Sequence, residues 1–172
     1  MPTVVLDPLP AEIAALLERR RRWGADTHDE VWDGVLHMTP APSHAHAVLN
    51  AALTALLREP AAAAGLTVTD AFNLGDSKED FRVPDGGLHR PDAAEMWHPT
   101  AALVLEIVSP GDETRQKLPF YAAHHVDEVL IVDPQQRKAD WLALDDGQYR
   151  PIERSGLIEL GPAELAGQID WP

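Results

Sequence analysis

The sequence predicts an α/β fold, and three features indicate this class. Its 172 residues suit one compact domain spanning 1–172, and a hydrophobic content of 45% is enough for a sizeable core. Residues 101–109 (AALVLEIVS) and 128–133 (EVLIVD) are nearly all apolar, as in strands that are covered on both faces. A helical segment separates them, and a strand, a helix and a strand within 33 residues predict a βαβ unit with parallel strands.

The part of the chain before this unit predicts helices and a hairpin. Residues 10–23 have the apolar spacing of a helix with a short apolar face. Asp33-Gly34 suits the tight type I′ turn of a hairpin over residues 31–36. Ser43 is a good N-cap for a second helix, which the apolar spacing carries to about Arg58.

Further strands and one more helix follow from local patterns. Pro119 is tolerated only in a first helical turn, so the helix of the βαβ unit should begin near residues 115–118 and run to about 125. The remaining expected elements are a strand at 66–72, a strand at 81–89 interrupted by Gly86-Gly87, a terminal hairpin at 141–152, and a short helix with a tail at 162–172.

Composition and charge exclude several classes of protein. The absence of cysteine excludes disulfides and thiolate metal sites. No apolar run approaches the ~20 residues that span a bilayer, and residues 1–9 lack the features of a signal peptide, so we expect a soluble cytoplasmic protein without membrane association. The net charge of −14 opposes binding to nucleic acid unless local charge or bound cations offset it.

The clearest basic cluster is the run of four arginines at residues 19–22. Such a run can contact a phosphate backbone, although most charge runs are solvated helix faces. Both interpretations stay open at the level of sequence.

Glu106 is a charged residue inside the most apolar predicted strand. An unpaired buried carboxylate costs several kcal/mol or becomes protonated, so Glu106 needs a cation, a metal or a hydrogen-bond network as its partner. A structural ion pair with an arginine or lysine is one solution. Lys117, in the first turn of the following helix, can reach back along the strand, and a metal can approach from the open end of the sheet.

Asp85 is the second candidate acid. It follows Pro84, which marks an edge or a bend in a strand, and a bent strand can aim a side chain into a site. An ordinary turn aspartate is the alternative. A second Pro-Asp pair, Pro91-Asp92, lies nearer to Glu106, but we prefer Asp85 because Pro84-Asp85 follows the predicted strand segment 81–83 (FRV).

These segments together resemble the Uma family of restriction-endonuclease-like proteins, within the PD-(D/E)xK nuclease superfamily. The resemblance covers residues 29–149 and is carried by 83–85 (VPD), 104–110 (VLEIVSP), Lys117 with Tyr121, and 131–134 (IVDP). It implies a core of helix, three-stranded meander, helix and strand. To this core the chain would add an N-terminal helix and hairpin and a C-terminal hairpin.

The resemblance also implies roles for individual residues. Asp85 and Glu106 match the two metal-binding acids of the family. The usual lysine position of the superfamily, two residues after the second acid, is Val108 here, and Lys117 matches the lysine that the Uma pattern carries on the following helix. Residues 42–46 (PSHAH) match a run at the first core helix, which makes His46 the matching histidine.

The leading hypothesis is therefore a metal-dependent endonuclease acting on DNA. Asp85 and Glu106 would hold Mg²⁺ or Mn²⁺, because hard cations prefer oxygen ligands. Lys117 would orient water or stabilise developing negative charge, and His46 would assist proton transfer or substrate positioning.

Two alternatives belong to other classes. A catalytically silent, homodimeric binding module that retains the fold is favoured by the acidic composition and disfavoured by the retained Asp, Glu and Lys set. An unrelated small-molecule hydrolase has little support, since neither a Gly-x-Ser-x-Gly elbow nor a zinc motif is present.

Overall fold

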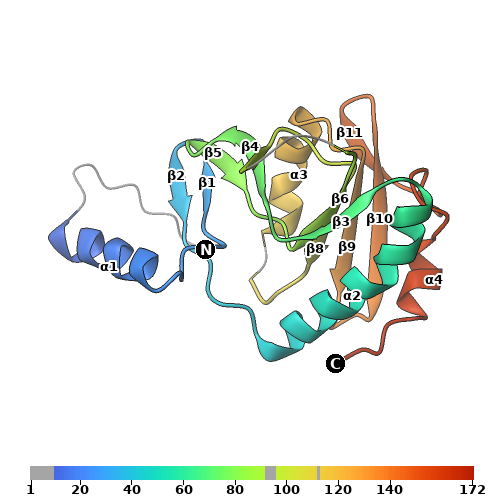
Figure 1. Cartoon of the computed structure of the whole chain (residues 1–172), viewed down its shortest axis with the longest axis horizontal. Helices are drawn as coiled ribbons and strands as arrows, with labels where there is room; N and C mark the ends of the chain where they lie inside the picture. The colour runs from blue at the N-terminus through green and yellow to red at the C-terminus, as the bar shows by residue number, and fades with distance from the viewer. Residues whose placement is uncertain (1–9, 92–95, 112) are drawn as a thin grey trace.

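The described residues form two β-sheets, and helices pack against the larger one (Figure 1). The computed structural model describes residues 10–91, 96–111 and 113–172, and the elements below are those of these residues. Their order is α1 (Ala11–Arg22), β1 (Glu30–Trp32), β2 (Val35–His37), α2 (His44–Ala63), β3 (Thr67–Asp70), β4 (Asn73–Ser77), β5 (Asp80–Arg82), β6 (Gly86–His89), β7 (Trp97–His98), β8 (Leu103–Ile107), α3 (Thr114–Ala123), β9 (Glu128–Asp133), β10 (Lys138–Asp145), β11 (Gln148–Pro151) and α4 (Pro162–Ala166).

The strands are divided between the two sheets. The smaller sheet has the order β2-β1-β5-β4-β7, and the larger has the order β11-β10-β9-β8-β6-β3. In the larger sheet β3, β6 and β8 form an antiparallel meander, and β8 then pairs with β9 in parallel across α3. The predicted βαβ unit and the meander of a restriction-endonuclease-like core are thereby confirmed.

The larger sheet is covered on both faces, as its apolar strands predicted. Leu103, Leu105 and Ile107 of β8 belong to a core cluster with residues of α2 and α4. Val104 belongs to a second cluster with Tyr121 of α3. Because side chains alternate along a strand, Glu106 lies on the same face as Val104, toward α3. The carboxylate thus faces the helix that carries Lys117.

Helix α2 begins as predicted but ends later. Ser43 caps it by accepting a hydrogen bond from the amide of His46 at 3.2 Å. The prediction of an end near Arg58 was wrong, because the helix continues through Pro60 to Ala63. Leu49, Leu53, Leu57 and Ala61 form one buried stripe at intervals of four residues. The burial of Ala61 and the high helix propensity of the alanine run offset the hydrogen bond that Pro60 cannot donate.

The prediction that Pro119 lies in the first turn of its helix was also wrong. Helix α3 begins at Thr114, which places Pro119 beyond the first turn. Contacts on both sides of Pro119 hold the helix together at the proline. Tyr121 is fully buried, and Lys117 forms ion pairs with carboxylates. Tertiary packing here overrides the local cost of proline.

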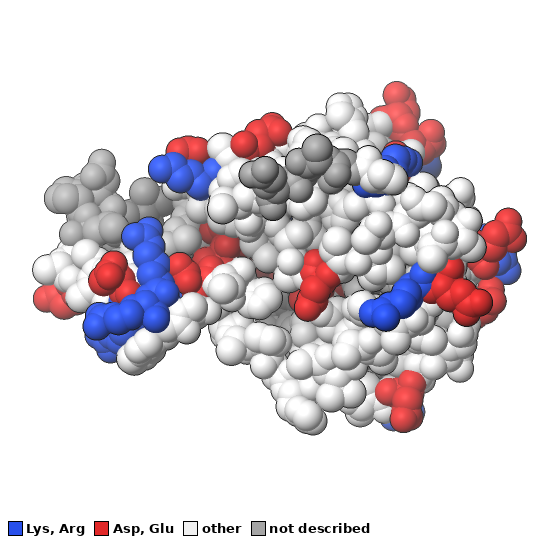
Figure 2. All heavy atoms as spheres, viewed as in Figure 1, with Lys and Arg blue, Asp and Glu red and all other residues white. Residues whose placement is uncertain are grey.

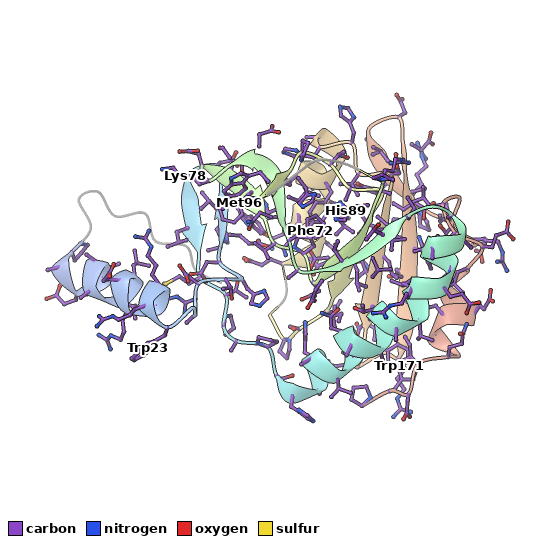
Figure 3. The ribbon with its side chains drawn as sticks, viewed as in Figure 1. Trp23, Phe72, Lys78, His89, Met96 and Trp171 are labelled. Carbon is purple, nitrogen blue, oxygen red and sulfur yellow. The ribbon has the colours of Figure 1, made fainter. Side chains whose placement is uncertain are left out.

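The segment predicted as one strand at 81–89 is two strands in different sheets. β5 belongs to the smaller sheet and β6 to the larger, and residues 83–85 carry the chain between them. Gly86 and Gly87 do not interrupt a strand but begin β6, where they allow close packing. A Cβ on Gly87 would lie 2.6 Å from the carbonyl oxygen of Leu103 and 2.8 Å from the ring of Phe72. Phe72 packs edge-on against His89, with ring centroids 4.4 Å apart (Figure 3).

The N-terminal elements agree with the sequence pattern. The β1–β2 hairpin turns at Asp33-Gly34, where both residues have positive φ, as a type I′ turn requires. Helix α1 buries none of its residues and extends away from both sheets (Figure 1). Within the part of the chain that the structure describes, no helix combines the length and apolar character needed to cross a membrane.

Candidate active site

Asp85 lies where the chain passes from the smaller to the larger sheet. Its Oδ2 accepts a hydrogen bond from the backbone amide of Ile107 at 2.7 Å, and its Oδ1 lies 2.9 Å from Nε2 of His46. The backbone carbonyl of Asp85 accepts a hydrogen bond from the Asn50 amide at 3.1 Å. The bend at Pro84 thus aims the Asp85 carboxylate at the end of β8, one residue from Glu106.

Glu106 is 3% exposed and faces α3. Its Oε1 accepts hydrogen bonds from Nζ of Lys117 at 3.0 Å and from the hydroxyl of Tyr121. Its Oε2 has no hydrogen-bond partner among the described residues. The predicted contact between Glu106 and Lys117 is therefore present, and one carboxylate oxygen is left for a further ligand.

Glu30 is a site residue that the sequence analysis missed. It is 4% exposed and accepts three hydrogen bonds, from Nζ of Lys117 at 2.9 Å, from the amide of Val83 at 2.8 Å and from the indole of Trp32 at 2.6 Å. Lys117 therefore lies between two buried carboxylates. The only sequence signal was a glutamate at the start of a short hairpin strand, a position where surface residues are common.

Charge and burial shift the pKa values of this cluster. Burial raises the pKa of Glu106 to about 7; the Lys117 charge opposes this effect, while the charges of Asp85 and Glu30 reinforce it. Burial alone would lower the pKa of Lys117, but the charges of Glu106 and Glu30 outweigh burial and raise it above its ordinary value. Burial and the Glu106 charge raise the pKa of Tyr121, which keeps its hydroxyl protonated as a donor.

A second buried glutamate shows what a purely structural carboxylate looks like in this protein. Glu128 accepts hydrogen bonds from the Trp141 indole at 2.8 Å, the Ser155 hydroxyl at 2.6 Å and the Gly156 amide at 2.7 Å. Neutral donors thus satisfy both of its oxygens. Glu106 differs, because a lysine shared with Glu30 and a single hydroxyl hold only one of its oxygens.

Two further polar contacts surround Asp85. The other ring nitrogen of His46, Nδ1, lies 3.4 Å from the hydroxyl of Ser109. Asn50 donates from its Nδ2 to Asp70 at 2.9 Å as well as to the Asp85 carbonyl. His46 is therefore beside the acids, as predicted. The competing Asp92 lies outside the described residues.

The cluster opens into a cleft of about 820 Å³. The β1–β2 hairpin and the segment that follows it line one part of the cleft, and α2 from His46 to Arg58 lines another. Asp85, Glu106, Lys117 and His46 all belong to the lining. A ligand entering the cleft would therefore meet all four of these residues.

The donor set fits a hard divalent cation bound partly by solvent or substrate. Within residues 10–91, 96–111 and 113–172, no group of three or more His, Asp or Glu residues is placed to hold a metal by itself. Mg²⁺ commonly uses only one or two carboxylates, with water and substrate phosphates completing its octahedron. Asp85 and Glu106 supply two carboxylates, and the free Oε2 of Glu106 suits this mode.

The mixed sheet with its meander and the crossover helix define a restriction-endonuclease-like protein. The chain belongs to the Uma2 family, described as putative restriction endonuclease, whose model matches residues 16–168. The resemblance to the Uma family is thereby confirmed.

A solved structure of another protein shows the same fold. The crystal structure of a putative nuclease belonging to DUF820 from Anabaena variabilis ATCC 29413 matches with a TM-score of 0.64 and 12% identity, over 81% of this chain and 90% of that chain. A chain of the cryo-EM structure of the DrdV–DNA complex matches with 19% identity over 69% of this chain and 10% of that chain, but its TM-score is only 0.40. No curated protein matches the sequence.

Proposed function

We propose that this protein is a metal-dependent endonuclease that hydrolyses phosphodiester bonds in DNA. The observation that carries the proposal is the convergence of Asp85, Glu106 and Lys117 in one cleft of a protein from a family of putative restriction endonucleases. Two acids with a buried lysine beside them combine what phosphodiester hydrolysis needs: ligands for a divalent ion and a fixed positive charge.

Asp85 and Glu106 would hold Mg²⁺ or Mn²⁺. Such an ion supplies Lewis-acid stabilisation of charge on a phosphate. Tyr121 and Lys117 orient the Glu106 carboxylate by hydrogen bonds to its Oε1. The Ile107 amide fixes Oδ2 of Asp85. The two carboxylates are therefore held by neighbours that do not depend on a bound ion.

Lys117 would stabilise negative charge that develops on the phosphate. The carboxylates of Glu30 and Glu106 keep its ammonium group charged despite its burial. A preorganised charge in a water-poor site stabilises a transition state more strongly than the same charge in bulk solvent. His46, bonded to Asp85, lies where it can position a phosphate or transfer a proton.

The alternative is a catalytically silent, homodimeric binding module. The net charge of −14 favours it, because the molecule as a whole repels a polyanion. The acidic side chains that line the cleft, Glu30, Asp70, Asp85, Glu106 and Glu113, outnumber its cations Lys117 and Arg58, so a bound divalent ion would favour binding of a phosphate there. We therefore expect DNA binding to the cleft to depend on divalent metal.

A cleavage assay tests the proposal. Wild-type protein is incubated with supercoiled, linear and single-stranded DNA in Mg²⁺, in Mn²⁺ and in EDTA. Glu106→Gln and Lys117→Ala should each lower the rate by roughly a hundredfold or more, as expected for groups that stabilise charge in the transition state.

Matched controls use exposed residues of the same type. Glu79→Gln and Lys78→Ala alter side chains that are 68% and 81% exposed, and both variants should cleave at the wild-type rate. Metal-dependent cleavage by Glu106→Gln at the wild-type rate would contradict the role proposed for Glu106. No cleavage of any substrate with either metal would favour the silent binding module.

A further inference from the structure

Most lysines and arginines of this protein form ion pairs with carboxylates, but one group of arginines does not. Outside α1, the lysines and arginines form ion pairs with carboxylates, apart from Arg58 and Arg137. In the last turn of α1, by contrast, Arg19, Arg21 and Arg22 are exposed, and none has a hydrogen bond or ion pair with any residue in the described ranges. The largest group of free positive charge therefore lies on this single turn.

The end of α1 is held in a defined place. Arg20, the fourth arginine of the run, donates to Oδ1 of Asp29 at 2.5 Å and to the carbonyl oxygen of Thr39 at 3.1 Å. Asp29 in turn accepts a hydrogen bond from the Thr39 amide at 2.8 Å. Thr39 lines the active-site cleft, as does His28, the residue before Asp29. One arginine thus fixes the turn beside the cleft, and three are left free.

The free arginines face solvent beside an otherwise acidic molecule. Figure 2 shows the largest group of Lys and Arg atoms on this face at α1, with some acidic atoms beside it. Trp23, directly after the run, is 73% exposed and also points away from the sheets (Figure 3). Arg58, another free cation, lines the cleft from α2. Free positive charge therefore lies both beside the cleft and within its lining.

We propose that the last turn of α1 binds the phosphate backbone of the nucleic acid whose scissile bond lies in the cleft. The inference rests on the proposed function. Arginine forks hydrogen-bond phosphate oxygens in pairs, and a polyanion is the ligand that complements three unpaired guanidinium groups on one turn. The proposal also accounts for how a protein with a net charge of −14 can hold DNA, because the attraction is local.

An acidic surface of a second copy of the chain is the competing occupant. The position of the turn favours DNA, since Arg20 of the same turn contacts Thr39, which lines the cleft. Self-association through the same turn would not require that proximity. The two occupants give opposite results in the experiment below.

The test compares Arg19→Gln/Arg21→Gln/Arg22→Gln with a variant of equal charge, Arg90→Gln/Arg150→Gln/Arg154→Gln, in which each arginine is exposed and paired with a carboxylate. Binding of a short fluorescent duplex is measured with Ca²⁺ at several salt concentrations. Three phosphate contacts contribute about 2.7 to the slope of log K against log salt, so between about 50 and 200 mM salt the wild-type affinity should fall on the order of 40-fold more than that of the α1 variant. The control variant should keep the wild-type slope.

Each outcome decides the proposal. Equal slopes for the two variants would overturn it, as would an unchanged DNA affinity together with a lost dimer in sedimentation of the α1 variant. Cleavage measured in parallel separates this inference from the proposed function. A shallower slope with no cleavage supports the arginine contact and removes the endonuclease, whereas cleavage with equal slopes does the reverse.

Discussion

Replacing Glu106 with glutamine should change stability in a direction that identifies the role of this residue. The pKa of Glu106 is raised from 4.5 to about 7 in the folded protein. The folded state therefore holds a proton that the unfolded chain releases, and the Glu106 carboxylate becomes destabilising as pH rises through this window. At 1.36 kcal/mol per pKa unit, the full cost above pH 7 is about 3 kcal/mol.

The metal-free wild type should thus lose stability relative to Glu106→Gln between about pH 4.5 and 7, with no further change above. Lys117 does not alter the direction in which stability changes with pH in this range. Its raised pKa contributes stability that is fully present below its ordinary value of 10.5. A structural ion pair would give the opposite result, because Glu106→Gln would be destabilised throughout neutral pH.

A bound divalent ion should offset the loss of stability that the buried Glu106 carboxylate causes. An ion that binds only the folded state at ~100 times its dissociation constant contributes about 2.7 kcal/mol. For a domain of this size that corresponds to a rise in melting temperature of roughly 5–10 °C. Glu106→Gln should not show this rise, because it lacks the charge that a hard cation requires.

Thermal melts of wild type, Glu106→Gln and the surface control Glu79→Gln would measure both effects. Each protein is melted with EDTA and with saturating Mn²⁺, at about pH 5 and about pH 8, on either side of the raised pKa. The reasoning is refuted if the wild-type melt at the higher pH ignores Mn²⁺, or if Glu106→Gln melts below wild type without metal at both pH values.

The other predictions concern Asp85, Glu30 and Gly87. Asp85→Asn should abolish cleavage while Asp92→Asn leaves most of it, and the reverse result in the same plasmid assay would assign the Pro-Asp acid to Asp92. Glu30→Gln should slow cleavage by at least about tenfold while the Mn²⁺ thermal shift persists, since Glu30 holds Lys117 and the expected ligands remain; loss of the shift would instead place Glu30 among the ligands. Gly87→Ala should lower stability by about 1–3 kcal/mol in denaturant melts, because its methyl group overlaps Phe72 and the Leu103 carbonyl; Gly156→Ala, whose Cβ meets only an atom 3.5 Å away, is the neutral control.

Those parts of the fold that depend on local pattern could be predicted from the sequence. The strands of the βαβ unit are continuous apolar runs, and the Asp33-Gly34 turn requires a backbone that few other pairs adopt. β4 and β7 escaped prediction because neither has an apolar alternation. β4 reads NLGDS and β7 is two residues long, so their strand character depends on pairing: β4 pairs with β5 and β7, and β7 pairs with β4.

The candidate site was predictable to the extent that its residues stand out locally. Glu106 is conspicuous inside an apolar strand, and Asp85 follows a proline that breaks one. Glu30 carries no such mark, because its burial results from a contact with Lys117 that only the folded chain makes. The errors at Pro60 and Pro119 have the same origin, since buried neighbours outweigh a local preference.

The bond between Glu30 and Lys117 joins positions 87 residues apart. Bringing together two positions so far apart costs more conformational entropy than forming a local helix or hairpin. A fragment truncated to begin at Ser43 would keep His46, Asp85, Glu106 and Lys117, and it would satisfy any search for the nuclease motif. It would also leave the Val83 amide and one side of the lysine without their acceptor. The smallest fragment of this chain that keeps the candidate site intact therefore begins before Glu30.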